Sequence, residues 1–425
     1  MQRTVLLISV AVSAVMAIQA QSVSLDSCRS WARANYPTVR QYELVEKSEQ
    51  YSVSNAARAW IPQIRFSAQA TWQTDAASFP EELTGMLAAM GSDIKGMRQD
   101  QYKIALDLQQ NIWDGGKSTA DKKIAQAQAQ ADRLSADIDL YALESRIDNL
   151  YFGILLLDGQ TEQMENRIAL LRENMRRCQV MADNSVLLQS DVDAVEVEVL
   201  SLQQKREQLV FSCMAYREML SMMTGRDVRE GSLTMPEKQE IILMTNERPE
   251  LRLLDAKSDY VASQRGTILA ASMPQFSAFA QGYYGYPNLD MFKSMQSSEW
   301  GLNGIVGVRM QWNIGAYYTQ KNNLSKLDVA RQQIDVQRDV FDYNRRIQIS
   351  QENAEILRLS KALENDDKIV ELRGNVRRAA EIKYENGTIT TSELLQKIAD
   401  ESNAQSARSI HQIELRKAQY ELQNL

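Results

Sequence analysis

The stretch Gln63-Ile-Arg-Phe-Ser-Ala-Gln-Ala-Thr-Trp-Gln73 decides the fold. Every even position in it is apolar, and every odd position is polar or charged. Successive side chains of a β-strand point to opposite faces, so this alternation predicts a strand with one apolar and one polar face. Two interpretations fit such a strand. One is the half-buried sheet of a soluble protein, and the other is a transmembrane β-barrel, whose strands cross the bilayer in about 9–11 tilted residues.

Three further segments repeat the alternation, so four strands are expected, at about 61–75, 101–114, 273–287 and 301–314. Aromatic residues gather in or beside these segments, as they do at the two water interfaces of membrane barrels. The predicted aromatic belt consists of Trp72, Trp113, Tyr284, Trp300 and Trp312. This clustering favours the membrane barrel, as does the lack of any other apolar partner for the sheet.

The N-terminal segment 1–20 supports the same interpretation. It has a basic residue at Arg3, an apolar core over 5–18 and a small residue at Ala20, which is the pattern of a cleaved secretory signal peptide. The alternative is an uncleaved membrane anchor. The core is shorter than the roughly 20 residues that a spanning helix needs, so export with cleavage is favoured. The sequence therefore predicts an exported protein.

Four strands are too few to close a barrel. Even small membrane barrels have about eight strands, and a lipid-exposed sheet edge leaves backbone groups without hydrogen-bond partners. If the barrel interpretation is correct, strands from several chains must close it together. The sequence thus predicts an oligomer.

The chain contains an internal duplication. Pro62-Gln63 reappears as Pro274-Gln275, and the segment Trp113–Gly116 reappears as Trp312–Gly315. Matching landmarks in the same order indicate two structural repeats, expected at 21–224 and 248–425 and joined by a linker at 225–247. Each repeat is expected to run helix, strand, strand, long helix, helix, with outer loops at 77–100 and 288–300.

The long helices carry coiled-coil patterns. Residues 117–182 contain no proline and hold apolar residues at alternating spacings of four and three, which is typical of a coiled-coil seam. The seam comprises Leu143, Ile147, Leu150, Ile154, Leu157, Met164, Ile168, Leu171, Met175 and Cys178. In the second repeat Ile369, Leu372, Val376 and Ala379 keep this rhythm within a helix at about 317–384.

Composition excludes several kinds of site. The chain has 425 residues, one histidine, three cysteines and a formal charge of −7. One histidine and three scattered cysteines supply neither a multi-histidine nor a four-thiolate metal site, and an acidic chain is a poor nucleic-acid binder. His411 has no triad pattern around it, and no phosphate-binding glycine loop follows a strand. We therefore expect no enzyme, no catalytic residue, no cofactor, no metal and no nucleic-acid partner.

Several short motifs make the pattern more specific. They are Asn35-Tyr36-Pro37, Arg248-Pro249-Glu250-Leu251, Pro62-Gln63, Pro274-Gln275, Ile112-Trp113-Asp114-Gly115-Gly116, and Tyr384-Glu385-Asn386-Gly387 before Ser392-Glu393-Leu394-Leu395. Their order and spacing resemble the outer membrane efflux protein family, the TolC-like channels of tripartite exporters. The resemblance implies a mainly α fold with a membrane β-barrel, in which a homotrimer forms a 12-stranded barrel in outer membrane lipid and a 12-helix tunnel through the periplasm. It also implies cargo delivered by an inner-membrane transporter through a periplasmic adaptor protein.

The resemblance places an entrance constriction at the lower helix hairpins. The expected positions are Glu393 and Gln396 in the second repeat and Asp191 in the first, with Asp193 as a neighbouring acid. Carboxylates from several chains in a narrow neck favour cations, although Gln396 stands where the family has a second acid. The alternative for Asp191 and Glu393 is a role at a helix start, near the positive end of the helix dipole.

The two hairpin turns are the surfaces that an adaptor would contact in this family. They are Asn184-Ser185 and Asn386-Gly387. The sequence analysis therefore predicts a passive outer membrane exit duct for efflux or type I secretion. The alternative function is a secreted coiled-coil surface scaffold without channel activity, which would explain the coiled-coil helices but not four aromatic-flanked strands.

Overall fold

The computed structural model describes residues 22–91, 94, 96–237 and 248–425. The expected signal peptide and residues 238–247 of the expected linker lie outside these residues. Up to residue 224 the elements are α2 (Leu25–Asn35), α3 (Val39–Ala57), the 3-10 helix η1 (Arg58–Trp60), β1 (Gln63–Trp72), α4 (Glu81–Ala89), β2 (Asp100–Trp113), α5 (Lys117–Asp183) and α6 (Gln189–Thr224). After residue 248 they are α7 (Pro249–Ser263), α8 (Arg265–Ala270), β3 (Gln275–Tyr286), α9 (Met291–Gln296), β4 (Gly301–Gln311), α10 (Ala316–Glu385) and α11 (Thr391–Gln423).

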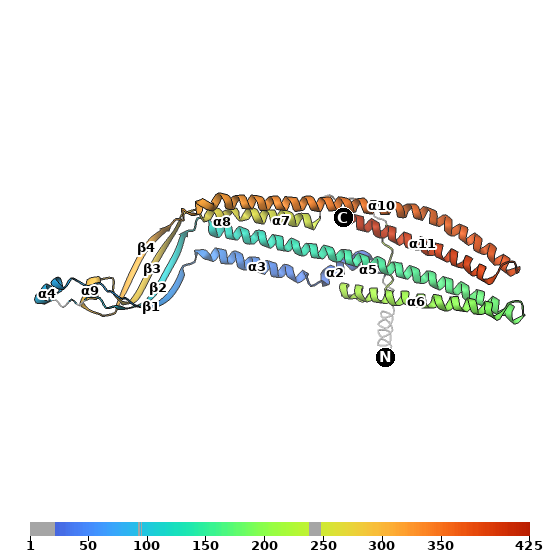
Figure 1. Cartoon of the computed structure of the whole chain (residues 1–425), viewed down its shortest axis with the longest axis horizontal. Coiled ribbons are helices and arrows are strands. Elements are labelled where there is room, and N and C mark those ends of the chain that lie inside the picture. The colour runs from blue at the N-terminus through green and yellow to red at the C-terminus, as the bar shows by residue number, and fades with distance from the viewer. Residues whose placement is uncertain (1–21, 92–93, 95, 238–247) are drawn as a thin grey trace, which may run out of the picture. The chain divides into compact units, whose positions relative to one another are not determined.

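The fold is mainly helical, with one small antiparallel sheet (Figure 1). The second series of elements repeats the order of the first. Two details differ from the expectation. The first helix of each series is divided, into α2 and α3 and into α7 and α8, and both outer loops contain a short helix, α4 or α9. The first division has a local cause, because Tyr36 precedes Pro37 and adopts an extended backbone.

Within the described residues, no helix combines the length and the apolar character needed to cross a membrane.

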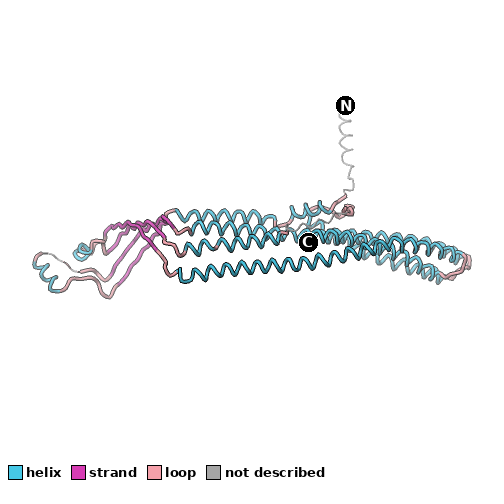
Figure 2. The backbone as a smooth tube through the Cα atoms, turned by 90° about the horizontal axis from the view of Figure 1, so that it is seen from above, coloured by secondary structure: helices cyan, strands magenta, loops and turns pink. Residues whose placement is uncertain are grey.

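The sheet contains four strands in the order β1-β2-β3-β4, all antiparallel (Figure 2, magenta). Its register pairs odd residues with odd residues across all four strands, so that Arg65, Asp107, Gln281 and Ile305 form one row. One irregularity lies between Asn111 and Trp113 at the end of β2. The register therefore keeps all odd-numbered residues, which include most of the polar ones, on one face and the mainly apolar even-numbered residues on the other.

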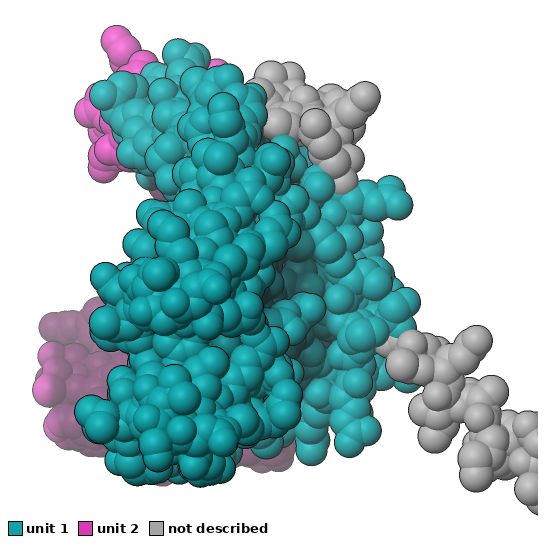
Figure 3. Space-filling model, turned by 90° about the vertical axis from the view of Figure 1, so that its right-hand side faces the viewer, with its two compact units in different colours: residues 1–43, 133–252, 337–425 teal, residues 44–132, 253–336 magenta. Residues whose placement is uncertain are grey.

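The chain divides into two compact units (Figure 3), and each unit takes segments from both halves of the chain. Unit 1 comprises 1–43, 133–252 and 337–425, and unit 2 comprises 44–132 and 253–336. Unit 2 contains the sheet. Unit 1 contains the hairpin of α5 and α6 and the hairpin of α10 and α11.

The core of unit 1 forms two clusters along the predicted seam of α5. Leu143, Ile147 and Ile154 belong to the first cluster, with Leu25 and Cys28 of α2. Ile168, Leu171 and Cys178 belong to the second, near the hairpin turns. The apolar stripe predicted on the first long helix is thus buried within unit 1.

The seam predicted for the second long helix has a different environment. Ile369, Leu372 and Val376 of α10 are exposed, and α10 instead turns Leu359 and Tyr384 into the interior. Periodicity predicts a packing stripe but not its partner. The stripe is exposed within the part of the chain that the structure describes, so the seam predicted for this helix stays a prediction.

Candidate channel surfaces

The even-numbered face of the sheet is mainly apolar and largely exposed. On β1 Phe66 is 71% exposed, and on β4 Leu302 and Val306 are 84% and 82% exposed. The opposite face is polar, and in the central strands it includes the buried residues Ala105, Ser277 and Tyr283. A sheet that leaves its apolar face bare in one chain needs an apolar environment for that face.

Aromatic residues border the apolar face at both ends of the strands. At the end near the loops Trp300 stacks on Tyr102, with ring centroids 5.6 Å apart, and lies at a tilt 5.5 Å from the Tyr284 ring, and Trp72 ends β1. At the end near the helices Trp113 lies 6.0 Å from the Phe276 ring.

Also at the helix end, the Trp312 indole donates a 2.9 Å hydrogen bond to the Ser272 carbonyl. The five residues predicted for the aromatic belt thus occupy two rows, one at each end of the apolar face.

Both outer strands of the sheet have a free edge. Among the described residues β1 pairs only with β2, and β4 pairs only with β3. Each edge presents backbone N–H and C=O groups that can pair with a strand of another chain.

The joint between β2 and α5 is built by Asp114 and two glycines. The buried Asp114 carboxylate accepts hydrogen bonds from the Gly116 backbone N–H at 3.0 Å and from the Ser118 backbone N–H at 2.7 Å. Gly115 and Gly116 have positive φ angles of 70° and 88°. A carboxylate at a helix start satisfies N–H groups that lack helical partners, and glycine adopts positive φ without strain. These residues fix the direction in which the strand enters the helix.

The hairpin turns have the same backbone geometry in both copies. The Asn184 side-chain amide donates to the Val180 carbonyl at 2.7 Å, and the Asn386 amide donates to the Ile382 carbonyl at 2.8 Å. The following residue is left-handed in both turns, with φ 63° at Ser185 and 67° at Gly387. All four predicted adaptor-contact residues therefore lie at exposed helix ends.

The four residues predicted at the entrance do not gather into an acidic cluster within one chain. The Asp191 carboxylate accepts from the Leu188 backbone N–H at 3.3 Å, and the Glu393 carboxylate accepts from the Thr390 N–H at 2.8 Å. Both carboxylates thus cap a helix start, as in the alternative considered above. The bonds from Thr390 lower the pKa of Glu393, so this carboxylate stays ionised at neutral pH.

The other two entrance residues are exposed and hydrogen-bond along their own helices. The Gln189 side chain donates to Asp193 at 3.1 Å, and the Gln396 side chain donates to Asp400 at 2.9 Å. In the described part of the chain no group of three or more metal-ligating side chains could hold an ion.

Sequence reasoning missed a link between the two hairpins of unit 1. The Cys178 thiol of α5 lies 3.1 Å from the Tyr384 hydroxyl of α10, which lies 3.3 Å from the Thr391 hydroxyl of α11. Burial raises the pKa of Tyr384 to about 12. Nearby, Arg177 forms a 3.2 Å ion pair with Glu385. Cys178 is the last residue of the apolar stripe on α5. This position is the one sequence feature that could have suggested a contact with another helix.

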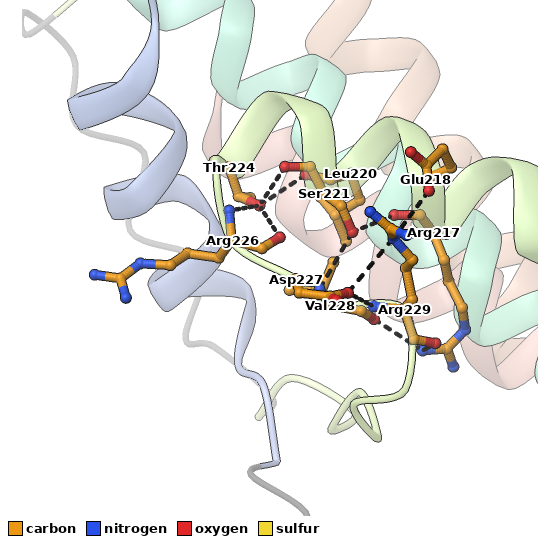
Figure 4. Close-up of polar contacts among 9 residues, drawn as sticks. All are labelled: Arg217, Glu218, Leu220, Ser221, Thr224, Arg226, Asp227, Val228 and Arg229. Atoms are coloured by element: carbon orange, nitrogen blue, oxygen red, sulfur yellow. Dashed lines mark hydrogen bonds and ion pairs between the residues drawn. The ribbon is translucent and has the colours of Figure 1, made fainter.

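A second missed element is Arg217 on α6, which binds the segment after that helix (Figure 4). Its guanidinium donates to the carbonyls of Val228 and Gly231 at 3.3 and 2.6 Å and to the Asp158 carboxylate at 2.7 Å. Figure 4 also shows Ser221, whose hydroxyl accepts from the Val228 N–H at 3.2 Å. Such turns have no periodic signature, so the sequence did not reveal them.

The Asn35 motif contacts the same turn. The Asn35 side-chain amide donates to the carbonyls of Met222 and Met223, each at 3.3 Å, at the end of α6. Gly225 ends the helix with a φ of 65°, and a side chain there would meet Asn35 at 2.7 Å.

The single histidine has a structural partner. His411 Nδ1 lies 2.6 Å from the Asp366 carboxylate, between α11 and α10. The three cysteines are free and buried.

Two helices of unit 1 also carry exposed apolar residues. On α10 they are Val340, Tyr343, Ile347 and Leu357, in addition to the stripe described above. On α6 they are Val197, Leu200, Phe211, Met214, Met219 and Met222. Helical surfaces of this kind are suited to packing against helices of another chain.

Comparison with known proteins identifies the fold. No protein-family model matches the chain, and no relative is found among curated proteins. Solved structures do match. The outer membrane protein VceC of Vibrio cholerae is 15% identical, with a TM-score of 0.69 over 94% of this chain and 96% of that one.

The outer-membrane channel OprN is 13% identical, with a TM-score of 0.69 over 94% of this chain and 89% of OprN. The Campylobacter jejuni CmeC outer membrane channel is also 13% identical, with a TM-score of 0.65 over 94% of this chain and 84% of that one. At these identities the agreement shows a common fold along almost the whole chain.

Proposed function

This chain has the fold of the outer membrane efflux protein family, and from that premise we propose that it is the outer membrane channel of a tripartite exporter. It acts as a passive exit duct and not as an enzyme. Its sheet lies in the outer membrane, and its helices extend into the periplasm.

The observation that carries this proposal is the two-faced sheet. Its apolar face is largely exposed and bordered by aromatic rows, and its opposite face carries polar or charged residues on every strand. β1 has 10 residues, which corresponds to roughly 33 Å along the strand. Tilted at 35–45°, such a strand covers about 25 Å of height, the thickness of the apolar band of an outer membrane barrel.

Three chains would complete the channel. Each contributes four strands with two free edges, so three copies give 12 strands without an open edge. The exposed apolar residues of α6 and α10 support the same assembly, because helices of neighbouring chains would cover them. The trimer itself follows the resemblance to the family.

Coupling to a pump belongs to the same proposal. The turns Asn184-Ser185 and Asn386-Gly387 are the surfaces offered to a periplasmic adaptor protein, which would connect the duct to an inner-membrane transporter. Their matching geometry suits an adaptor that meets both hairpins alike. The proposed channel entrance lies beside them, at Asp191, Asp193, Glu393 and Gln396, where the capping bonds hold the Asp191 and Glu393 carboxylates at the starts of their helices without removing their charge.

A pair of neighbouring cysteine variants tests the orientation of the sheet. Gln69→Cys places a thiol on the polar face, and Ala70→Cys places one on the apolar face of the same strand. The native cysteines are all buried, so the unchanged protein is a low-background control. In proteoliposomes a charged maleimide should label position 69 readily and position 70 at least about tenfold more slowly, because lipid excludes the charged reagent.

Planar-bilayer recording of the same preparation, with its mass, tests the duct. We expect discrete conductance steps from a particle of about three times the 48.3 kDa chain. A water-soluble monomer or filament without conductance, labelled equally at both positions, would reject the channel and favour the secreted coiled-coil scaffold.

A further inference from the structure

The polar face of the sheet carries a charge opposite to that of the whole chain. Although the chain has a formal charge of −7, the charged residues on this face are Arg65, Lys103 and Arg309 against the single acid Asp107. The face therefore has a net charge of three minus one, or +2. The remaining charged residue of the strands, Asp100, lies at the start of β2 in an ion pair with Arg98.

The register separates these charges into rows. Arg65 and Asp107 are direct neighbours across β1 and β2, so this row is balanced. The row of Lys103 contains Gln69, Gly285 and Gly301, and Arg309 pairs with Ser277. Two cations thus occupy rows without an acid, on either side of a balanced row.

Aromatic side chains of β3 hold both unbalanced cations in place. The Lys103 ammonium lies 4.6 Å from the centre of the Tyr283 ring and donates to the Gln281 side chain at 2.9 Å. The Arg309 guanidinium lies 4.8 Å from the centre of the Phe279 ring. A ring and an amide fix the position of a cation without neutralising its charge, whereas a carboxylate would neutralise it. Arg65 and Arg309 form no ion pair within the part of the chain that the structure describes.

We propose that Arg65, Lys103 and Arg309 make the sheet end of the duct a basic filter that favours anionic solutes over cations. This inference rests on the proposed function, because only a closed barrel turns the polar face into the wall of a pore. In a trimer the face would contribute a charge of about +6 around one lumen, and rings of Arg and Lys side chains select anions in pores. Lumen-facing substitutions in barrels change selectivity without exposing charge to lipid. The substrate class is therefore anionic or neutral cargo.

The test compares reversal potentials of single channels in a KCl gradient. In the triple variant Arg65→Gln, Lys103→Gln and Arg309→Gln, we expect the chloride-to-potassium permeability ratio to fall at least about threefold below the unchanged protein. Asp107→Asn removes the one acid of this face and should raise the ratio. Lys293→Gln, in α9 outside the strands, is the matched control and should leave it unchanged.

Each outcome is decisive. If the triple variant and Asp107→Asn both conduct with the permeability ratio of the unchanged protein, the basic filter is overturned. The proposed duct then stands. An unchanged protein that never conducts overturns the duct and the filter with it. If the triple variant does not insert, the single variants Lys103→Gln and Arg309→Gln must each lower the ratio, and the charge-preserving pair Lys103→Arg and Arg309→Lys must retain it. Acidic residues elsewhere in the channel are the same in all variants. The change in the permeability ratio between variants therefore reports the substituted residues.

Discussion

Asp148 is expected to hold the N-terminal helix α2 on unit 1. Its carboxylate accepts two hydrogen bonds from the Arg29 guanidinium, at 2.7 and 2.5 Å, and one from the Asn424 amide at 2.9 Å. The Asp148 side chain is only 4% exposed, and the Arg29 side chain is 18% exposed. The ion pair with Asp148 raises the pKa of Arg29 against the opposing effect of its own burial. Arg29 belongs to α2, so the pair connects this helix to α5.

The variant Asp148→Asn removes the carboxylate that pairs with the Arg29 guanidinium and leaves only the weaker attraction of Glu144 and Asp26. Breaking a buried ion pair in this way costs about 3–5 kcal/mol. Because the guanidinium keeps some contact with water, we expect the lower end, about 3 kcal/mol. At ~1.4 kcal/mol per tenfold change, local opening of α2 should become more than a hundredfold more frequent.

Hydrogen exchange measured by mass spectrometry tests this expectation locally. Peptides covering Leu25–Asn35 should lose about two orders of magnitude of protection in Asp148→Asn. Peptides from the hairpin turn at 184–188 serve as an internal control and should not change. The double variant Arg29→Met and Asp148→Leu replaces the pair by apolar side chains and should recover most of the protection. A change below threefold in Asp148→Asn would refute the role assigned to this pair.

Three further predictions concern unit 1. Ser185→Gly should stabilise its hairpin turn by about 0.5–1 kcal/mol, because glycine adopts the positive φ of Ser185 without strain. Slower hydrogen exchange at the turn would show this gain, and Gly387→Ser should have the opposite effect on its own turn. Burial raises the pKa of Cys28 to about 12, so a maleimide should leave this thiol unmodified at pH 8 until the protein is unfolded, and rapid modification of the folded protein would contradict this. Burial and the charges of Glu421 and Glu355 raise the pKa of Glu352 in the folded protein. The folded protein should therefore lose stability as the pH rises from the pKa of Glu352 in the unfolded chain through its higher pKa in the folded protein. Glu352→Gln should then raise the melting temperature at pH 7 but not below pH 4, and an equal gain at both pH values would exclude the charge as the cause.

Local patterns predicted the parts of the structure that depend on one segment alone. The alternation in Gln63–Gln73 gave the strand and its faces, because a strand exposes alternate residues whatever its partner. The seam of α5 from Leu143 to Cys178 gave a buried stripe for the same kind of reason, since residues three and four apart share one side of a helix.

Contacts between distant segments were decided only by the tertiary structure. The stripe at Ile369, Leu372 and Val376 has the same rhythm as the seam of α5 but is exposed within the described residues. Likewise Asp191 and Glu393 could be placed at the hairpins from the sequence, but whether their carboxylates face a pore or cap their own helices depends on side-chain geometry.

The sequence by itself determined the four two-faced strands, the long helices and their repeated order. The tertiary structure alone decided that Arg29 meets Asp148 across 119 residues, that Arg217 binds the turn after α6, and that strand pairing brings Arg65, Lys103 and Arg309 onto one sheet. The physical reason is the distance along the sequence over which each kind of interaction acts. Periodicity is set by backbone geometry within a few residues, whereas ion pairs and charged faces depend on which distant segments the fold brings together.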